Sequence, residues 1–380
     1  MKNTIYKYFF YEFSRYFIIT LFALASIVWV VQAVNFLDLV TEDGHAFTIY
    51  FTYTLLTLSK VFTKLIPFCF LISTVLTILK FEKDNELIVL WTSGLNKIHM
   101  VNLIFRISLV VMLLQLTLTN LVNPQLLNLS RTVIKNSQLQ FIPSLLKEKQ
   151  FNDTVESLTI FVENKSEDGV YENIFILDEG KILSNIQALE SGGDDTIFAK
   201  SGYVTSDEKN LVLLDGNIQK LNDDGSVNLV KFEKTIFDLS GITTKSISDP
   251  KIQETSTIQI IRCIQYQYFN YPKNLCERYS GNFTDTKIEI NKRFGMPFFI
   301  PLIGLVCCFL FMSRKDKKIS EFKKYIYFFI GFVFLMTGEI TVRYSGISWN
   351  HTFIYYLIPL SMLPIFYFFL IKTIKYENLT

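Results

Sequence analysis

Six long apolar segments alternate with polar stretches along this chain of 380 residues. Each has the roughly 20 apolar residues that a helix needs to cross a bilayer. Prolines and glycines fall inside some of them, which membrane helices tolerate. The pattern predicts three spans, a polar insert and three further spans. The segments are Phe17–Val40, Phe51–Leu79, Met100–Val122, Phe294–Met312, Tyr325–Val342 and Phe353–Ile371.

Composition supports a membrane protein with a polar insert. Half of the residues are hydrophobic, and 36 are phenylalanine, which is too apolar for an ordinary soluble domain. The net charge of +2 gives no support for a nucleic-acid partner. Lysine and arginine gather in both tails and in the loops at 80–97 and 313–324, whereas the loops at 41–45 and 343–351 carry few. Both termini are therefore expected in the cytoplasm and the insert outside.

The insert has the alternating pattern of half-buried strands over residues 155–240, as in "LTIFVEN" and "NIFILDE". Glycine, asparagine and aspartate separate these runs, which favours hairpins in a sandwich, jelly roll or open barrel. Residues 125–148 and 253–292 are expected to be helical connectors. Two roles stay open for the domain: a spacer or sensor with a filled core, or a sheet whose inner face or edges take a lipid chain or another β-domain.

Motifs of enzymes and metal sites are missing from the sequence. It has no Walker A, GxSxG, HExxH or CxxC pattern, and its three histidines lie far apart. We therefore expect no catalytic residue, no metal and no cofactor. The five cysteines follow no ligand spacing, and whether Cys263 and Cys276 form a disulfide stays open.

Basic residues occur at helical spacing near the outer end of the spans. Lys60 and Lys64 lie four residues apart within the second span, and Arg131 and Lys135 repeat this spacing after the third. They are expected to form a basic rim at the outer leaflet. Such residues either extend to the lipid headgroups without further function or bind an anionic headgroup.

The stretch "KDNELIVLWTSGLNKIHM" (83–100) joins two spans through a short amphipathic element. Leu87, Leu90 and Trp91 lie on one side of the predicted helix, which ends at Ser93-Gly94. This apolar side needs something to pack against. Glu86 stands at the helix N-terminus, where an acidic side chain is favourable in any case.

The segment from 55 to 95, "LLTLSKVFTKLIPFCFLISTVLTILKFEKDNELIVLWTSGL", resembles the LptF/LptG permeases, which export lipopolysaccharide from Gram-negative inner membranes. In the family, an apolar span with an internal proline is followed by a short charged turn and by a helix that begins with glutamate and ends in a small residue and glycine. Pro67, Glu86 and Ser93-Gly94 occupy those places here. "VNPQLLNLSR" (122–131) and "EINKRFGMPFFIPLIGL" (289–305) extend the resemblance over nearly the whole chain. "ENKSEDGVYENIFILDE" and "EINKR" look more like LptF than LptG.

The resemblance implies an α-helical membrane protein with an inserted periplasmic β-jellyroll, α+β overall. Its parts would be spans 1–3 in residues 1–124 with a coupling helix at 83–98, the periplasmic domain in 125–290 and spans 4–6 in 291–380. The chain would extract lipopolysaccharide and pass it to a periplasmic bridge, without enzymatic activity of its own. The implied partners are an LptG-like permease, an LptB-like ATPase dimer, and LptC-like and LptA-like periplasmic proteins.

The resemblance also implies roles for individual residues. Those that would contact the ATPase are Glu86, Leu87, Leu90, Trp91 and Gly94. The candidates for the lipid headgroup are Lys60, Lys64, Arg131 and Lys135. The first span ends in "VVQAVNFLDLV", without the basic residue that some relatives carry there. The rival interpretations are a membrane-anchored receptor or scaffold without transport, and an integral-membrane enzyme acting on lipids, against which the missing catalytic groups argue.

Overall fold

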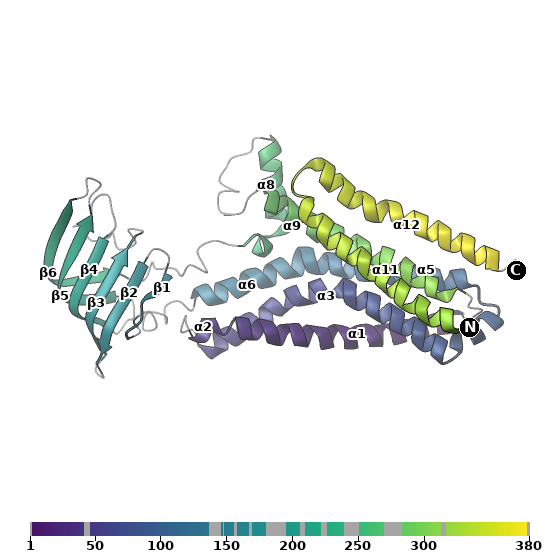
Figure 1. Cartoon of the computed structure of the whole chain (residues 1–380), viewed down its shortest axis with the longest axis horizontal. Coiled ribbons are helices and arrows are strands. Elements are labelled where there is room, and N and C mark those ends of the chain that lie inside the picture. Colours follow the sequence, from purple (N-terminus) through teal and green to yellow (C-terminus); the bar gives the residue numbers. More distant parts are fainter. Residues whose placement is uncertain are drawn as a thin grey trace. The chain divides into compact units, whose positions relative to one another are not determined.

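The computed structural model describes most of the chain as helices and strands (Figure 1). The described residues are 2–41, 46–136, 146, 148–155, 158–166, 169–179, 195–205, 210–221, 226–238, 251–269, 283–312 and 317–377. They form two compact units. The membrane unit comprises Met1–Val31, Thr57–Asn128 and Pro250–Thr380, and the β unit comprises Gln32–Leu56 and Leu129–Asp249.

Long helices make up most of the described chain outside the sheet. The helices are α1 (Lys2–Asn35), α2 (Asp38–Thr41), α3 (Phe47–Lys83), α4 (Glu86–Thr92), α5 (Lys97–Thr117), α6 (Asn123–Asn136), α8 (Thr257–Phe269), α9 (Phe283–Gly295), α10 (Phe299–Cys308), α11 (Lys317–Tyr344) and α12 (Trp349–Glu377). Short helical turns also occur: η1 (Leu118–Val122), η3 (Ile252–Glu254), η5 (Met296–Phe298) and η6 (Phe309–Phe311).

Six stretches of the described residues are long and apolar enough to cross a membrane, as the hydropathy pattern predicts. They are Thr4–Thr41, Phe47–Lys83, Lys97–Lys135, Phe283–Phe311, Lys324–Tyr344 and Trp349–Tyr376. Consecutive helices join without a break in some of them. The third span, for example, runs from α5 through the π-helical turn η1 into α6.

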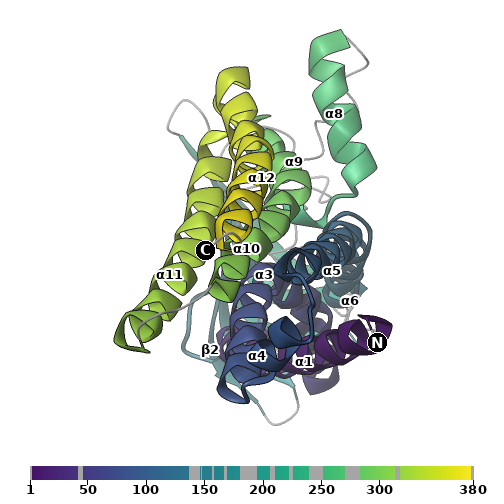
Figure 2. The ribbon, with the colours of Figure 1, turned by 90° about the vertical axis from the view of Figure 1, so that its right-hand side faces the viewer.

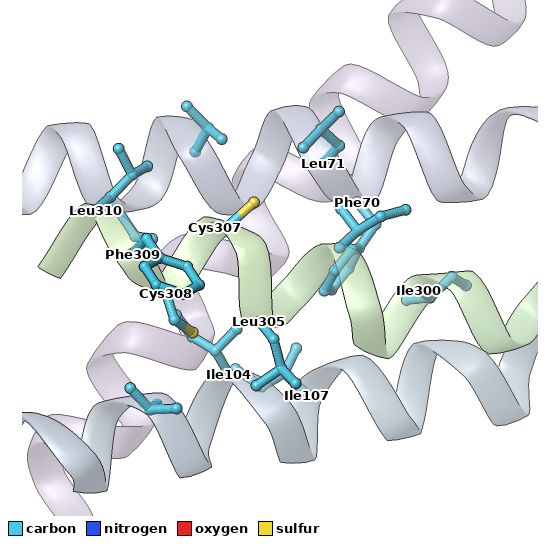
Figure 3. Packing of buried hydrophobic residues seen from close by; sticks show 14 of the residues in the cluster. Phe70, Leu71, Ile104, Ile107, Ile300, Leu305, Cys307, Cys308, Phe309 and Leu310 are labelled. Atoms are coloured by element: carbon cyan, nitrogen blue, oxygen red, sulfur yellow. The ribbon is translucent and has the colours of Figure 1, made fainter. Parts of the chain in front are cut away.

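Helix α10 lies at the centre of the membrane unit, with every residue from Phe299 to Cys308 buried. Figure 3 shows it between α3, which contributes Phe70 and Leu71, and α5. Lipid tails are as apolar as leucine, so close packing rather than water exclusion holds such helices together. A β-carbon on Gly304 would lie 3.2 Å from the β-carbon of Ser108, so this small pair lets α10 and α5 approach closely.

Helices α1, α11 and α12 lie at the periphery and expose apolar side chains. In the most apolar part of each span, 6% of the residues are buried for α1, 22% for α11 and 17% for α12. The corresponding share for the span through α9 and α10 is 89%. The exposed side chains of α1 include Ile18, Phe22 and Ile27. Lipid or another membrane subunit must cover these faces.

The described strands of the β unit form one antiparallel sheet in which each strand pairs with the next along the chain. This is the order of a meander, and the described pairings do not contain the Greek-key exchange of a jelly roll. The predicted class, membrane helices with an inserted sheet domain, is confirmed. The strands are β1 (Asn152–Val155), β2 (Leu158–Lys165), β3 (Val170–Asp178), β4 (Asp195–Val204), β5 (Asn210–Leu221) and β6 (Val227–Asp238).

One face of the sheet carries the core of the β unit. Side chains alternate between faces along a strand, so residues such as Ile160, Ile176 and Ile197 lie on the same face, paired across β2, β3 and β4. All three are at most 3% exposed. The described part of this face is therefore filled by the protein's own side chains.

The cysteines differ in state. Cys69, Cys307 and Cys308 are free and buried in the spans. Cys263, on α8, is disulfide-bonded. Cys276 lies outside the described residues.

Candidate functional site: helix α4 and a basic pocket

Helix α4 is separated from its neighbours by two positions with a left-handed backbone. Asn85, with φ 58°, lies in the turn after α3 and immediately precedes α4. Gly94, with φ 81°, follows α4 at the turn into α5, and glycine adopts this conformation at little cost. The side chain of Asn96 then accepts a hydrogen bond from the Ile98 backbone nitrogen at 3.0 Å, which begins α5. The α4 segment is thus a distinct helix between two spans.

The predicted apolar anchors of α4 face the protein's own core. Leu87 is 7% exposed and belongs to the buried cluster of the membrane unit, and Leu90 and Trp91 pack against that cluster. The ring of Trp91 meets Phe311 edge-on, with 6.0 Å between centroids. These contacts hold α4 against the bundle.

The apolar groups that α4 exposes are Ile88 and Val89, which are 59% and 64% exposed. Sequence reasoning missed them because "LIVLW" is apolar throughout, so the pattern alone does not say which side faces inward. The free apolar surface of α4 therefore lies on the side opposite Leu87.

Polar contacts connect α4 and the end of α3 to other helices. The hydroxyl of Tyr8, on α1, donates a hydrogen bond to Oε1 of Glu86 at 3.1 Å. Lys80 pairs with Glu12 of α1 at 2.7 Å. The same end of α3 reaches α11 through Glu82 and Lys324, 3.6 Å apart. A displacement of α4 would therefore act on α1 directly.

A basic pocket lies in the membrane unit, where α3 and α5 meet the start of the fourth span. Lys60, Lys64, Lys292 and Arg293 line it together with Glu289 and Glu339. Four cationic and two acidic side chains leave it a net charge of +2. Lys60 and Lys64 thus line the same pocket, as their spacing on one helix predicts. The other charged residues of the pocket lie more than 200 positions away from them in the sequence.

Arg293 is 3% exposed, and its guanidinium is fully engaged. Its Nε donates to Glu289 at 2.9 Å, and its Nη1 donates to the Thr257 hydroxyl at 2.9 Å and the Thr255 carbonyl at 3.0 Å. Its Nη2 donates to the Ile252 and Gln253 carbonyls. Arg293 therefore clamps η3 and α8 to α9 rather than offering its charge to a ligand.

The three lysines of the pocket differ in whether a carboxylate pairs with them. Lys292 pairs with Glu339 at 3.5 Å. Within the described residues, no carboxylate lies within ion-pair distance of Lys60 or Lys64. These two lysines therefore supply the positive charge that an anionic ligand would meet.

A family model gives the identity of the chain. The model described as lipopolysaccharide export system permease LptF/LptG matches residues 7–373. The chain belongs to the LptF/LptG family. It is also 25% identical over 253 residues, 64% of this chain and 67% of the relative, to an uncharacterized protein, RP871, of Rickettsia prowazekii (strain Madrid E).

Membership of the LptF/LptG family makes the chain a permease of lipopolysaccharide export, a transport component that works in a system with partner proteins. Together with the six apolar stretches, it supports a multi-pass protein of the inner membrane. The match does not distinguish LptF from LptG, so the closer likeness to LptF stays a prediction.

Arg131 and Lys135 lie on α6, where Arg131 is half-buried and Lys135 is exposed. They belong to the β unit, whereas Lys60 and Lys64 belong to the membrane unit. In this LptF/LptG permease, the basic pocket contains Lys60 and Lys64. A basic rim that also includes Arg131 and Lys135 stays a prediction.

Proposed function

We propose that this chain is one half of the membrane part of an ABC transporter that extracts lipopolysaccharide from the inner membrane. An LptG-like permease forms the other half, and an LptB-like ATPase dimer supplies the energy. The lipid passes to a periplasmic bridge of LptC-like and LptA-like proteins. The observation that carries the proposal is α4, which is fixed to the bundle by Leu87 and presents Ile88 and Val89 outward.

In this proposal α4 is the coupling helix and lies in the cytoplasm, with both termini. Ile88 and Val89 enter a groove of the ATPase, where apolar anchors supply most of the binding energy. Closure of the ATPase dimer pushes α4, and the Glu86 to Tyr8 hydrogen bond carries the push to α1. The exposed apolar face of α1 supports a role in lining the lipid cavity with the second permease.

The basic pocket then holds a phosphate of the lipid headgroup. Lys60 and Lys64 are its main cations, and Arg131 and Lys135 are further candidates. Ammonium groups form charge-assisted hydrogen bonds with phosphate oxygens, which are stronger than neutral ones. The pairing of Lys292 and Arg293 with carboxylates supports the assignment of the headgroup to Lys60 and Lys64.

The edge of the sheet supports an LptC-like partner. Strand β6 pairs with β5 on one side, and among the described strands nothing pairs with its other side. It exposes Val227, Leu229, Val230 and Ile236. A long apolar edge readily accepts a strand from another β-domain.

The experiment that tests the proposal is purification of the tagged chain from its native membranes in a mild detergent, with its partners identified by mass spectrometry. We expect an ABC-type ATPase and a second six-span permease. Recovery of the chain without an ATPase would refute the transporter and favour a receptor or scaffold.

Replacing Glu86 by arginine is expected to uncouple or release the ATPase. The change removes the acceptor of the Tyr8 hydrogen bond and reverses the charge at the start of α4. Glu86→Gln is the matched control, because its amide oxygen still accepts that bond. The measurement is lipopolysaccharide transfer per ATP hydrolysed in the reconstituted complex. Equal ratios for Glu86→Arg and the wild type would contradict the coupling role.

Replacing both Lys60 and Lys64 by alanine is expected to weaken lipopolysaccharide stimulation of the ATPase. Loss of two cations facing a phosphate should raise the half-maximal lipid concentration about tenfold. The control is the pair Lys372→Ala and Lys375→Ala, on α12 and outside the pocket. A dose response that is unchanged in the Lys60 and Lys64 variant would disprove the headgroup assignment.

A further inference from the structure

A second groove lies between α8, α9 and α12, and it shares no lining residue with the basic pocket. Its apolar walls come from Ile261 and Ile264 of α8, Ile290 of α9 and Trp349 of α12. The cavity of this groove has a volume of about 230 Å³. Such apolar walls suit a hydrocarbon chain.

Lys287 is the cation of this groove. Its ammonium nitrogen lies 4.4 Å from the centroid of the Phe283 ring and 5.4 Å from that of the Trp349 ring. Two acids of the basic pocket, Glu289 and Glu339, are paired with Arg293 and Lys292. Among the residues that the structure describes, none places a carboxylate within ion-pair distance of Lys287. The two rings therefore hold a positive charge that no described carboxylate neutralises.

The groove lies at the ends of two candidate spans, where a span meets the membrane surface. Lys287 is in the first turns of the span that begins at Phe283, and Trp349 is the first residue of the sixth span. Tryptophan is enriched at membrane–water interfaces, and a lysine near the end of a span extends its ammonium group toward them. Helix α8 stands apart from the bundle beside α9 (Figure 2) and exposes Ile258, as an amphipathic helix at a membrane surface does.

We propose that this groove binds one anionic glycerophospholipid of the surrounding bilayer. An acyl chain lies against Ile261, Ile264 and Ile290, and the phosphate accepts hydrogen bonds from the Lys287 ammonium. A single cation matches a single phosphate, whereas lipopolysaccharide, with several acyl chains and phosphates, is the cargo proposed for the basic pocket. The bound lipid would fill the space between α8 and the fourth and sixth spans.

The test uses Trp349 as a reporter. The background variant carries Trp29→Phe and Trp91→Phe, so Trp349 is its one tryptophan. The full chain is reconstituted in vesicles with increasing fractions of phosphatidylglycerol or phosphatidylcholine with brominated acyl chains, which quench tryptophan on contact. We expect half-maximal quenching at an approximately fivefold lower fraction of the anionic lipid, because a charge-assisted contact adds to acyl burial.

Variants of Lys287 decide whether the preference comes from the groove. Lys287→Gln is expected to remove the preference and Lys287→Arg to keep it, while Lys292→Gln, in the basic pocket, is the matched control that keeps it. Ile264→Glu, which places a carboxylate in the groove, should also remove it. Circular dichroism checks that each variant is folded.

Two results would overturn the proposal. The first is equal quenching by the two lipids in the background variant, or a preference that survives in Lys287→Gln. The second is recovery of Trp349 fluorescence when unbrominated lipopolysaccharide is added at the same fraction as the brominated anionic lipid. That recovery would assign the groove to the cargo instead.

Discussion

Replacing Ile88 and Val89 together by aspartate is expected to remove the ATPase from the purified complex while the permease stays folded. Both side chains are more than half exposed on α4, so their loss leaves no cavity in the core. If each contributes about 1.4 kcal/mol to docking, the affinity falls at least about 100-fold. The measurement is binding of the purified ATPase to the immobilised chain.

The matched control for this prediction is the variant Ile347→Asp, which changes an equally exposed isoleucine in the turn between α11 and α12. It should bind the ATPase like the wild type. Leu87→Asp is the opposite case, because Leu87 is buried in the core and its change should lower the yield of folded protein. ATPase affinity that is unchanged by the two aspartates would rule out the outward face of α4 as the docking surface.

Replacing Arg293 by leucine is expected to destabilise the membrane unit by about 3–5 kcal/mol, the cost of leaving a buried partner uncompensated. Glu289 would lose its cation, and the carbonyls of Ile252, Gln253 and Thr255 would lose their donor. The backbone carbonyl of Arg293 also accepts a bond from Thr119, in the π-helical turn of the third span. Thermal unfolding in detergent measures the change.

Arg293→Lys is the control for the clamp, because lysine keeps the charge but not the forked geometry that serves five acceptors. We expect it to unfold between the wild type and Arg293→Leu. Replacing both Glu289 and Arg293 by apolar residues should be milder than Arg293→Leu alone, because it leaves no unpaired buried charge. Unfolding of Arg293→Leu at the wild-type temperature would contradict the clamp.

Much of the fold is predictable from local pattern. Spans such as Phe51–Leu79 are evident because the bilayer requires a minimum apolar length, and the helix around them extends over Phe47–Lys83. Strands such as Leu158–Lys165 are evident from alternation, which places every second side chain in the core. The order of the strands in the sheet is not predictable in this way, because it depends on which strands pair, and alternation within one strand does not show its partners.

The sites are less predictable because they depend on contacts between distant residues. Tyr8 and Glu86 are separated by 78 positions, and Arg293 lies 38 positions from Thr255. An arginine next to a span is typical of a residue that reaches for headgroups, and only the surrounding carbonyls show that it is a clamp. Similarly, the inward side of α4 follows from the position of Phe311, next to Trp91.

The open question about the β-domain has a partial answer in the described strands. Its core face is filled by residues such as Leu158 and Leu213, which fits a rigid domain. The exposed edge of β6 fits the alternative of a partner β-domain. A lipid that crosses this domain would have to displace core side chains, or to follow a surface completed by a partner.

The measurement that tests the central proposal most directly is transfer of lipopolysaccharide by the reconstituted complex. Proteoliposomes with both permeases, the ATPase and the LptC-like protein are incubated with the soluble bridge protein, and the lipid that reaches it is quantified. We expect transfer with ATP, none with a non-hydrolysable analogue, and loss of transfer in the Ile88→Asp, Val89→Asp variant. An assembled complex that hydrolyses ATP but transfers no lipid would contradict the account.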